Sequence, residues 1–279
     1  MKKISSCDRI IKAHRVSARE IIQSGRGIGF KLIFLAESLR KEKRMYKYET
    51  HLHSSPVSKC GSYSVRENME FYKEIGYDGI FLTNHFVDAN IGCDRTLPYK
   101  EQIEFYFTDI EEGERLADEV GIKFFWGVET SYLGTDFLIY GLSKKWYLEH
   151  PEIMDMPRKD LLTMMANDGA LIVQAHPFRE ASYIDHIRLF PYNVHAVEID
   201  NCGNKPFQND MARLYTDTYK LHHFAGSDNH DARYAKRLAG VEFDTPIESI
   251  EDFIERVKNG EARTFSLDNE NNFTTDQEK

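Results

Sequence analysis

The sequence predicts an α/β protein in which about seven strand-helix units close into a barrel. Short apolar runs alternate with charged, amphipathic stretches from Tyr46 onward, as in repeated β-loop-α units. The apolar runs, such as residues 79–83, suit strands buried on both faces. Histidines and carboxylates follow many of these runs, and only a closed barrel brings so many parallel strand ends onto one face.

Composition sets the limits for this fold. A chain of 279 residues allows one large α/β barrel or two ordinary domains. A hydrophobic content of 41% and 18 Phe residues allow a sizeable core, which excludes disorder for most of the chain. The four cysteines, at positions 7, 60, 93 and 202, form no close pair. This spacing indicates no disulfide framework and predicts a cytoplasmic protein.

Charge is unevenly distributed along the chain. Residues 1–48 carry 13 Lys or Arg against four acids, whereas the remainder carries 23 against 41. An acidic body disfavours sequence-independent nucleic-acid binding, which depends on phosphate attraction. The basic arm is either a solvated helical extension or a site for an acidic partner, a membrane or RNA. No apolar run approaches the ~20 residues of a membrane span, and the start resembles no secretory signal.

These patterns predict three regions. Residues 1–44 form a basic helical extension, with helices expected at 6–24 and 29–44 on either side of a Gly-Arg-Gly break. Residues 45–267 form the barrel, and residues 268–279 are a polar tail. A chain beginning at Met45 would keep every candidate functional residue named below.

The elements of the barrel follow from local signals. Ser64 and Glu67 form a capping-box pattern that opens a helix, and Gly121 ends a long charged one. Strands are expected at 46–51, 79–83, 122–128, 136–140, 170–175, 194–199, 223–226 and 240–243. Helices are expected at 64–76, 99–120, 158–167, 209–221 and 247–259.

Candidate metal ligands follow five of these strands. They are His51 and His53, His85, Glu129, His176, and Asp228 with His230. Alternation along a strand points the imidazoles of His51 and His53 to the same side. Each motif alone also fits an ordinary role, namely a surface histidine, a salt bridge or a satisfied core histidine. Together, imidazoles and carboxylates at one end of a barrel predict a cluster of Zn, Mn or Fe ions.

Small residues precede the last motif. Ala225, Gly226 and Ser227 come directly before Asp228, so the chain can approach a crowded centre there. A buried carboxylate such as Glu129 is costly without compensation, and a bound ion supplies it.

The ordered set resembles the PHP (polymerase and histidinol phosphatase) superfamily of metal-dependent phosphoesterases. In that family an HxH motif ends the first strand, and it is followed in order by a His, a Glu, a further His and a late DxH. His51 and His53 match the first motif, and the other residues match the rest in order. The resemblance covers residues 45–265 and leaves the basic arm outside.

This resemblance implies a distorted seven-stranded (β/α) TIM-like barrel of PHP type. It implies two or three divalent ions, with Glu129 and Asp228 each near two of them. The implied activity is phosphoester hydrolysis by metal-activated hydroxide, as in histidinol phosphatases and nucleotide or sugar phosphoesterases. The expected substrate is a small phosphorylated molecule, and its identity stays open.

The chain departs from the family pattern in one loop. The family usually supplies another Asp or His after HxH, and here Cys60 is the soft ligand available. Either Cys60 fills that position or a third ion is weakly held. Some members use one more His near the sixth strand, for which His195 is the nearest candidate.

Other residues have expected roles in the reaction. Asp228 and His230 are the predicted catalytic residues, with His230 or a bound water protonating the leaving group. Arg179 is predicted to hold a phosphate oxygen, or else to form a surface salt bridge. Loops 86–98 and 143–157 are expected to shape the pocket.

Two other functions remain open at this level. An amidohydrolase barrel also begins with HxH, but it normally has a carboxylated Lys and a lone late Asp. A non-catalytic, metal-containing binding module is the second alternative, although so many open ligand positions exceed what a structural site needs.

Overall fold

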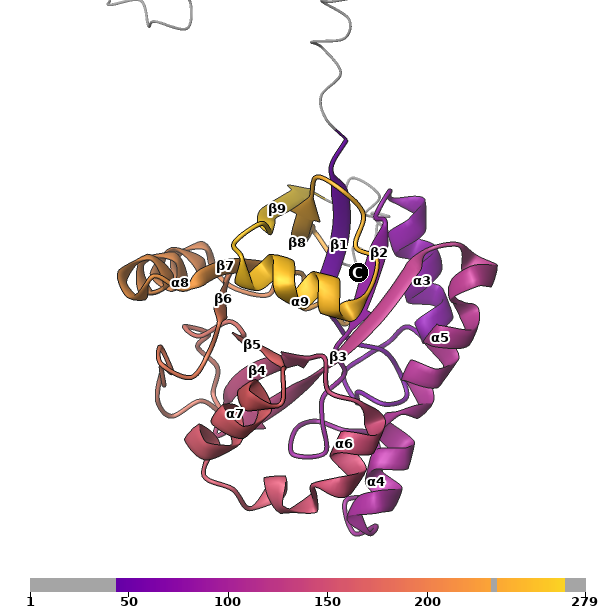
Figure 1. Cartoon of the computed structure of the whole chain (residues 1–279), viewed down its shortest axis with the longest axis vertical. Helices are drawn as coiled ribbons and strands as arrows, with labels where there is room; N and C mark the ends of the chain where they lie inside the picture. The colour runs from indigo at the N-terminus through magenta and orange to yellow at the C-terminus, as the bar shows by residue number, and fades with distance from the viewer. Residues whose placement is uncertain (1–43, 232–234, 269–279) are drawn as a thin grey trace, which may run out of the picture. The chain divides into compact units, whose positions relative to one another are not determined.

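A computed structural model of the chain describes residues 44–231 and 235–268 (Figure 1). The helices predicted at 6–24 and 29–44 lie outside the described residues except for Arg44. The predicted 268–279 tail also lies outside them, apart from Asp268.

The body of the protein is built on one nine-stranded sheet, in the order β7-β6-β5-β4-β3-β2-β1-β8-β9. Its strands are β1 (Tyr46–Leu52), β2 (Gly79–Leu82), β3 (Lys123–Tyr132), β4 (Thr135–Tyr140), β5 (Leu171–Gln174), β6 (Ala196–Asn201), β7 (His222–Gly226), β8 (Arg237–Phe243) and β9 (Arg263–Asp268).

The predicted count of seven strands is wrong, and so is the expectation of a wholly parallel sheet. Strands β1, β2 and β3 are parallel, as are β5, β6 and β7. Strand β4 is antiparallel to both of its neighbours, because a tight turn at Leu133 and Gly134, both with positive φ, returns the chain directly beside β3. The antiparallel pair β8 and β9 extends the sheet beyond β1.

The sheet nearly closes at the end where the parallel strands finish. Leu52, the last residue of β1, forms a parallel bridge with Asn229, which follows β7. His53 N–H donates to the Asn229 carbonyl at 3.1 Å, and Asn229 N–H donates to the His51 carbonyl at 3.4 Å. The two outermost ligand motifs are therefore held together by backbone hydrogen bonds, and the fold is barrel-like.

Helices cover the outside of the sheet and one end of its interior. They are α3 (Val65–Glu74), α4 (Tyr99–Tyr106), α5 (Thr108–Val120), α6 (Lys144–Glu149), η1 (Pro151–Met154), α7 (Arg158–Asn167), α8 (Pro206–Tyr219) and α9 (Ile250–Lys258). Helices α3 and α5 lie along one flank and α8 lies on the other (Figure 1). Ser64 caps α3 in the predicted capping box.

One predicted helix is two helices. The pattern of residues 99–120 continues without interruption, but the chain bends at Phe107, which ends α4 and begins α5. Phe107 is buried and packs edge-on against Trp126 of β3. A tertiary contact of this kind does not change the helical periodicity of the sequence, so the bend was not predicted. Helix α6, η1 and strand β9 were not expected either.

Aromatic residues fill the barrel interior below the site. Phe253 of α9 packs against Phe81, Tyr140 and Phe224 from three strands, with ring centroids 4.1, 5.5 and 6.2 Å away. Tyr140 donates its hydroxyl to the Thr50 carbonyl at 2.6 Å. The apolar core therefore supports the strand end that carries His51.

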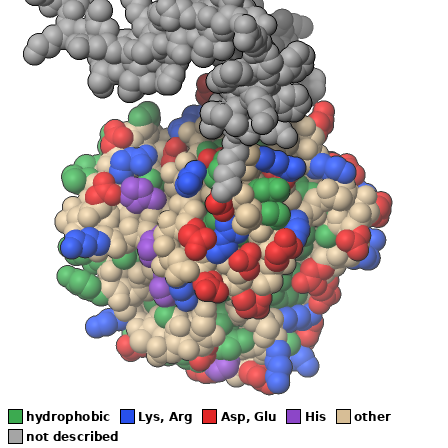
Figure 2. Space-filling view, turned by 45° about the horizontal axis from the view of Figure 1, so that its top comes forward, with side chains coloured by type: hydrophobic (Ala, Val, Ile, Leu, Met, Phe, Trp, Pro, Cys, Tyr) green, Lys and Arg blue, Asp and Glu red, His purple; other side chains and the backbone are tan. Residues whose placement is uncertain are grey.

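The surface agrees with an acidic body. On the face drawn in Figure 2, acidic and basic side chains of the described residues are interspersed, with several acidic ones grouped near the middle. Among residues 44–231 and 235–268, no helix combines the length and apolarity needed to cross a bilayer.

Candidate metal centre

Most of the predicted ligands lie on or shortly after five parallel strands, β1, β2, β3, β5 and β7. His51 lies in β1 and His53 directly follows it, while His85 comes three residues after β2. Glu129 was expected just beyond a strand, but β3 continues to Tyr132 and Glu129 lies inside it. His85 and Glu129 form an isolated parallel bridge, so the backbone itself places them side by side.

The remaining ligands follow β5 and β7 in strained backbone. His176 has φ 27° and Asp228 has φ 53°. Such left-handed conformations are unusual for residues other than glycine, and they cluster at functional sites. Gly226 lies close by, where an added Cβ would be 2.4 Å from the His51 Cβ. The predicted close approach of the chain to a crowded centre is confirmed at this glycine.

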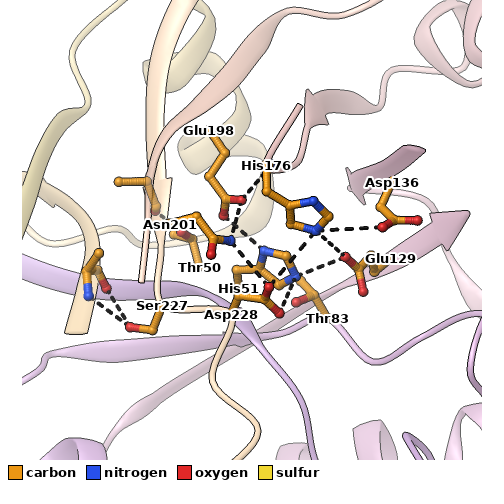
Figure 3. Close-up of polar contacts among 12 residues, drawn as sticks. Thr50, His51, Thr83, Glu129, Asp136, His176, Glu198, Asn201, Ser227 and Asp228 are labelled. Carbon is orange, nitrogen blue, oxygen red and sulfur yellow. Dashed lines mark hydrogen bonds and ion pairs between the residues drawn. The ribbon is translucent and has the colours of Figure 1, made fainter. Parts of the chain in front are cut away.

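Donor atoms of four residues lie close together, and Figure 3 shows three of these residues, His51, Glu129 and Asp228. His51 Nε2 is 3.2 Å from Glu129 Oε1 and 3.4 Å from Asp228 Oδ1. His53 Nε2 is 3.4 Å from Glu129 Oε2 and 3.3 Å from Asp228 Oδ1. Four ligands bonded tetrahedrally at about 2.1 Å lie about 3.4 Å apart. These pairs therefore have the spacing of ligands that share an ion, and His51 belongs to one group with His53 and Glu129 and to another with His176 and Asp228.

Further groups of donors adjoin the first. Cys60, His85 and His230 gather around His53, and Glu129, Asp136 and His176 form another group. Glu129 contacts a histidine of each group: its carboxylate lies 2.6 Å from His85 Nδ1 and 3.3 Å from His176 Nε2. The eight predicted ligands, His51, His53, Cys60, His85, Glu129, His176, Asp228 and His230, are hereafter the donor cluster. Their grouping can accommodate more than one divalent ion.

Buried atoms without hydrogen-bond partners mark the same place. His51 Nε2, His53 Nε2, His85 Nδ1 and Glu129 Oε2 are buried and make no hydrogen bond. Most buried polar atoms in proteins are satisfied, so four orphans in one cluster need an explanation. Imidazole nitrogens and carboxylate oxygens are the ligands that Zn, Mn and Fe take, so these residues fit divalent ions.

The pKa values of the residues in the cluster are shifted in different directions. Burial lowers the pKa of His51, but Asp228, Glu198 and Glu129 outweigh it and raise that pKa well above its ordinary value. Burial together with His230 and His85 lowers the pKa of His53. Burial raises the pKa of Glu129, but His85 and His51 bring it well below its usual range.

Cys60 lies inside the cluster. Burial raises the pKa of its thiol, but contacts with His230 and His85 outweigh this and lower the pKa to about 6. A thiol of this acidity is a thiolate at neutral pH, and the thiolate is the form that binds metals. Cys60 is therefore a geometrically suitable ligand for the position after HxH that the sequence left open.

Two carboxylates that the sequence did not single out complete the surroundings. Glu198 of β6 lies 2.9 Å from His51 Nδ1, and Asp136 of β4 lies 3.7 Å from His176 Nε2. Asp136 is the single acid of β4, whereas Glu198 shares β6 with Asp200, and these acids within strands were the available signal. By contrast, His195 lies just before β6, at the end away from the cluster, and its Nδ1 accepts from Ile172 N–H. It does not approach the donor cluster.

A cavity of about 550 Å³ opens above these residues. Arg179 lines it, and its Nη2 is 2.6 Å from Asp228 Oδ2 rather than at a surface partner. Ala89, Asn90 and Arg95 from the predicted 86–98 loop line it as well. Segment 143–157 does not, so that part of the pocket prediction is wrong.

Fold and site together define an α/β barrel-like protein with a buried cluster of metal-type ligands. The PHP_C family, described as PHP-associated, matches residues 206–262, a stretch that includes Asp228 and His230. No curated protein matches the chain.

Solved structures share the fold. A two-domain Bacteroides vulgatus protein, containing a predicted PHP-like metal-dependent phosphoesterase, superposes with a TM-score of 0.61 at 16% identity. The match covers 80% of this chain and 65% of that one. PsfC from Pseudomonas syringae gives a TM-score of 0.53 at 15% identity, covering 82% and 93%. The family match is confined to residues 206–262, and at these identities the solved structures show a shared fold.

Proposed function

We propose that this protein hydrolyses phosphate esters at a centre of two or three divalent ions held by the donor cluster. The observation that carries this proposal is the set of four orphaned atoms, on His51, His53, His85 and Glu129, beneath one cavity. Ions bonded to these atoms would satisfy them. The distances of 3.2 to 3.4 Å from the two histidines His51 and His53 to the carboxylates of Glu129 and Asp228 support the same assignment.

Bound ions of this kind supply hydroxide near neutral pH and take up negative charge on phosphoryl oxygens. The protein's part is to hold the ligands in place. Each Glu129 oxygen faces a different set of histidines, so its carboxylate is suited to lie between two ions. Asp228 faces His51 and His53 with Oδ1 and Arg179 with Oδ2.

Arg179 is the proposed phosphate-binding residue. Its guanidinium is anchored by Asn204 at 3.1 Å and by Asn201 at 2.8 Å, which orients it toward the cluster from the cavity wall. An oriented planar fork suits two phosphoryl oxygens. Arg179 forms an ion pair with Asp228 and therefore lies beside the ion site. The phosphoryl group of a small phosphorylated substrate would bind there.

The two roles predicted for His230 compete. Its Nδ1 lies 2.8 Å from the Asp228 carbonyl oxygen, which places the proton of the neutral ring on Nδ1. Nε2 then either binds an ion or carries a proton for the leaving group, but cannot do both together. With Cys60 and His85 adjacent, we assign His230 as a ligand first. Thiolate and imidazole favour Zn or Fe there, whereas Mn prefers oxygen ligands.

A panel of substrates tests this function. Metal-free protein is reloaded with Zn, Mn, Fe or Mg and assayed on sugar, nucleotide, amino-alcohol and tyrosine phosphates, beside amides and lactones. Turnover of phosphate esters alone is expected. Turnover of amides or lactones alone would favour the amidohydrolase alternative. Retained metal with no hydrolysis at all would favour a binding module.

A further inference from the structure

His53 turns its second ring nitrogen toward a buried hydroxyl. His53 Nδ1 lies 3.2 Å from Ser58 Oγ, and both residues are 1% exposed. A neutral imidazole carries one proton, and only its unprotonated nitrogen can bind a metal. Whether Ser58 donates to His53 or accepts from it therefore decides whether Nε2 is available to the site.

The proton of Ser58 is already committed. Ser58 Oγ lies 2.9 Å from Asn84 Oδ1. Two oxygens at that distance need a hydrogen between them, and a carboxamide oxygen has none to give. Ser54 N–H also donates to Asn84 Oδ1, at 2.7 Å, which identifies this atom as the oxygen of the amide.

A buried carboxylate fixes the amide in this orientation. Asn84 Nδ2 donates to Asp109 Oδ2 at 3.1 Å and to Ser54 Oγ at 2.9 Å. A flipped Asn84 would turn its oxygen toward the Asp109 carboxylate and its NH₂ toward Ser54 N–H. Both contacts would be repulsive inside a site with no water to relieve them.

Ser58 Oγ therefore has only lone pairs left for its other neighbours. One accepts His85 N–H at 2.9 Å, and the other faces His53 Nδ1. We propose that Asp109, Asn84 and Ser58 are positioning residues that hold His53 as its Nδ1–H tautomer. The Nε2 lone pair then points at Glu129 and Asp228.

This arrangement parallels the one at His51, where Glu198 contacts Nδ1 directly. At His53 the carboxylate is that of Asp109 in helix α5, and it acts through Asn84 and Ser58. The same hydroxyl holds His85 N–H, so one chain of hydrogen bonds orients ligands after β1 and β2. The same chain of hydrogen bonds gives Asn84, which directly precedes His85, a role in the site. The tautomer and its consequence for metal binding rest on the metal centre of the proposed function, but not on phosphate-ester hydrolysis.

Nitrogen NMR tests the tautomer directly. In zinc-loaded protein labelled with ¹⁵N-histidine, where the cation offsets the repulsion between the Nε2 lone pair and the two carboxylates, the His53 signals are assigned by their loss in His53→Gln. We expect Nδ1 protonated and Nε2 unprotonated. A wild-type spectrum with the proton on Nε2 overturns the proposal, whatever any variant does.

A pair of matched variants tests the cause. Ser58→Ala removes the acceptor, so the Nε2–H tautomer should become populated and zinc affinity, measured by chelator competition, should fall about 10–100-fold. Thr216→Ala is the control, because Thr216 is equally buried but its hydroxyl donates to the Ala212 carbonyl within α8, outside this network. It should leave tautomer and affinity unchanged, and Ser58→Thr, which keeps the hydroxyl, should retain the wild-type tautomer.

The outcomes separate this inference from the proposed function. An unchanged tautomer in Ser58→Ala, or an equal change in Thr216→Ala, would refute the hydrogen-bond chain. The expected spectra in a protein that hydrolyses no phosphate ester would uphold the chain and refute the function.

Discussion

At the scale of single residues, the site depends on carboxylates that do not line the cavity. Glu198 is fully buried and accepts hydrogen bonds on both oxygens. Oε1 faces His51 Nδ1 at 2.9 Å, and Oε2 accepts His176 N–H at 3.0 Å and an Asn201 amide proton at 2.8 Å. One side chain thus orients one proposed ligand and fixes the backbone of another.

Replacing this carboxylate by its amide should therefore weaken metal binding. In Glu198→Gln one oxygen becomes an NH₂ that faces a donor, whichever way the amide is turned. We expect metal affinity to fall about 10–100-fold, as is usual when a partner of a metal-binding histidine is lost. Isothermal titration of metal-free protein measures it, with Glu255→Gln on the exposed surface of α9 as control. Equal affinity in both variants would argue against the role of Glu198.

The lack of a side chain at Gly226 is equally specific. An added Cβ would lie 2.4 Å from the His51 Cβ and 2.8 Å from Glu198 Oε1. Gly226→Ala should lower the free energy of unfolding by about 1–3 kcal/mol, the usual effect of overpacking. Urea unfolding measures this, and unaltered stability would mean that β1 and β7 can separate without loss.

At the scale of elements, the sequence predicted the strand ends better than the strand partners. Apolar runs marked β2, β5 and β7, and the ligand order marked their shared end. The strand at 136–140 was predicted, but its antiparallel direction was not, because its residues are as apolar as those of a parallel strand. Glu198 and Asp136 were missed because an acid within a strand does not reveal which side chains it faces.

The amino ends of β5 and β6 carry a pH-sensitive contact. His195 Nδ1 accepts a hydrogen bond from Ile172 N–H, and burial, then Lys258 and His222, lowers the pKa of His195 to about 4. The folded protein therefore keeps this ring neutral, while the unfolded chain takes up a proton below its ordinary pKa of 6.5. The resulting stability is complete above pH 6.5 and is lost as the pH falls toward 4.

The variant His195→Asn isolates this effect. The amide oxygen of Asn can still accept from Ile172 N–H but does not titrate in this range. Between pH 7.5 and 5, urea unfolding should show a smaller loss of stability in the variant than in the wild type. Parallel losses in the two proteins would show that His195 is not responsible.

At the scale of the whole molecule, closure of the sheet makes the centre. The bridge between Leu52 and Asn229 joins the first ligand motif to the last across more than half of the chain. The sequence could predict that these motifs belong together, because their order matches a known family. It could not predict Ser58, Asn84 and Asp109 as a connected set, since hydrogen-bond chains depend on side-chain positions that no spacing rule records.

The central claim is that divalent ions in the donor cluster perform phosphate-ester hydrolysis. The most direct measurement is hydrolysis by metal-stripped protein during stepwise return of Zn or Mn, with bound metal determined in the same samples. The account predicts no turnover when the protein is stripped, and activity that rises with bound metal to two or three ions per chain. Full turnover in the stripped protein would contradict it.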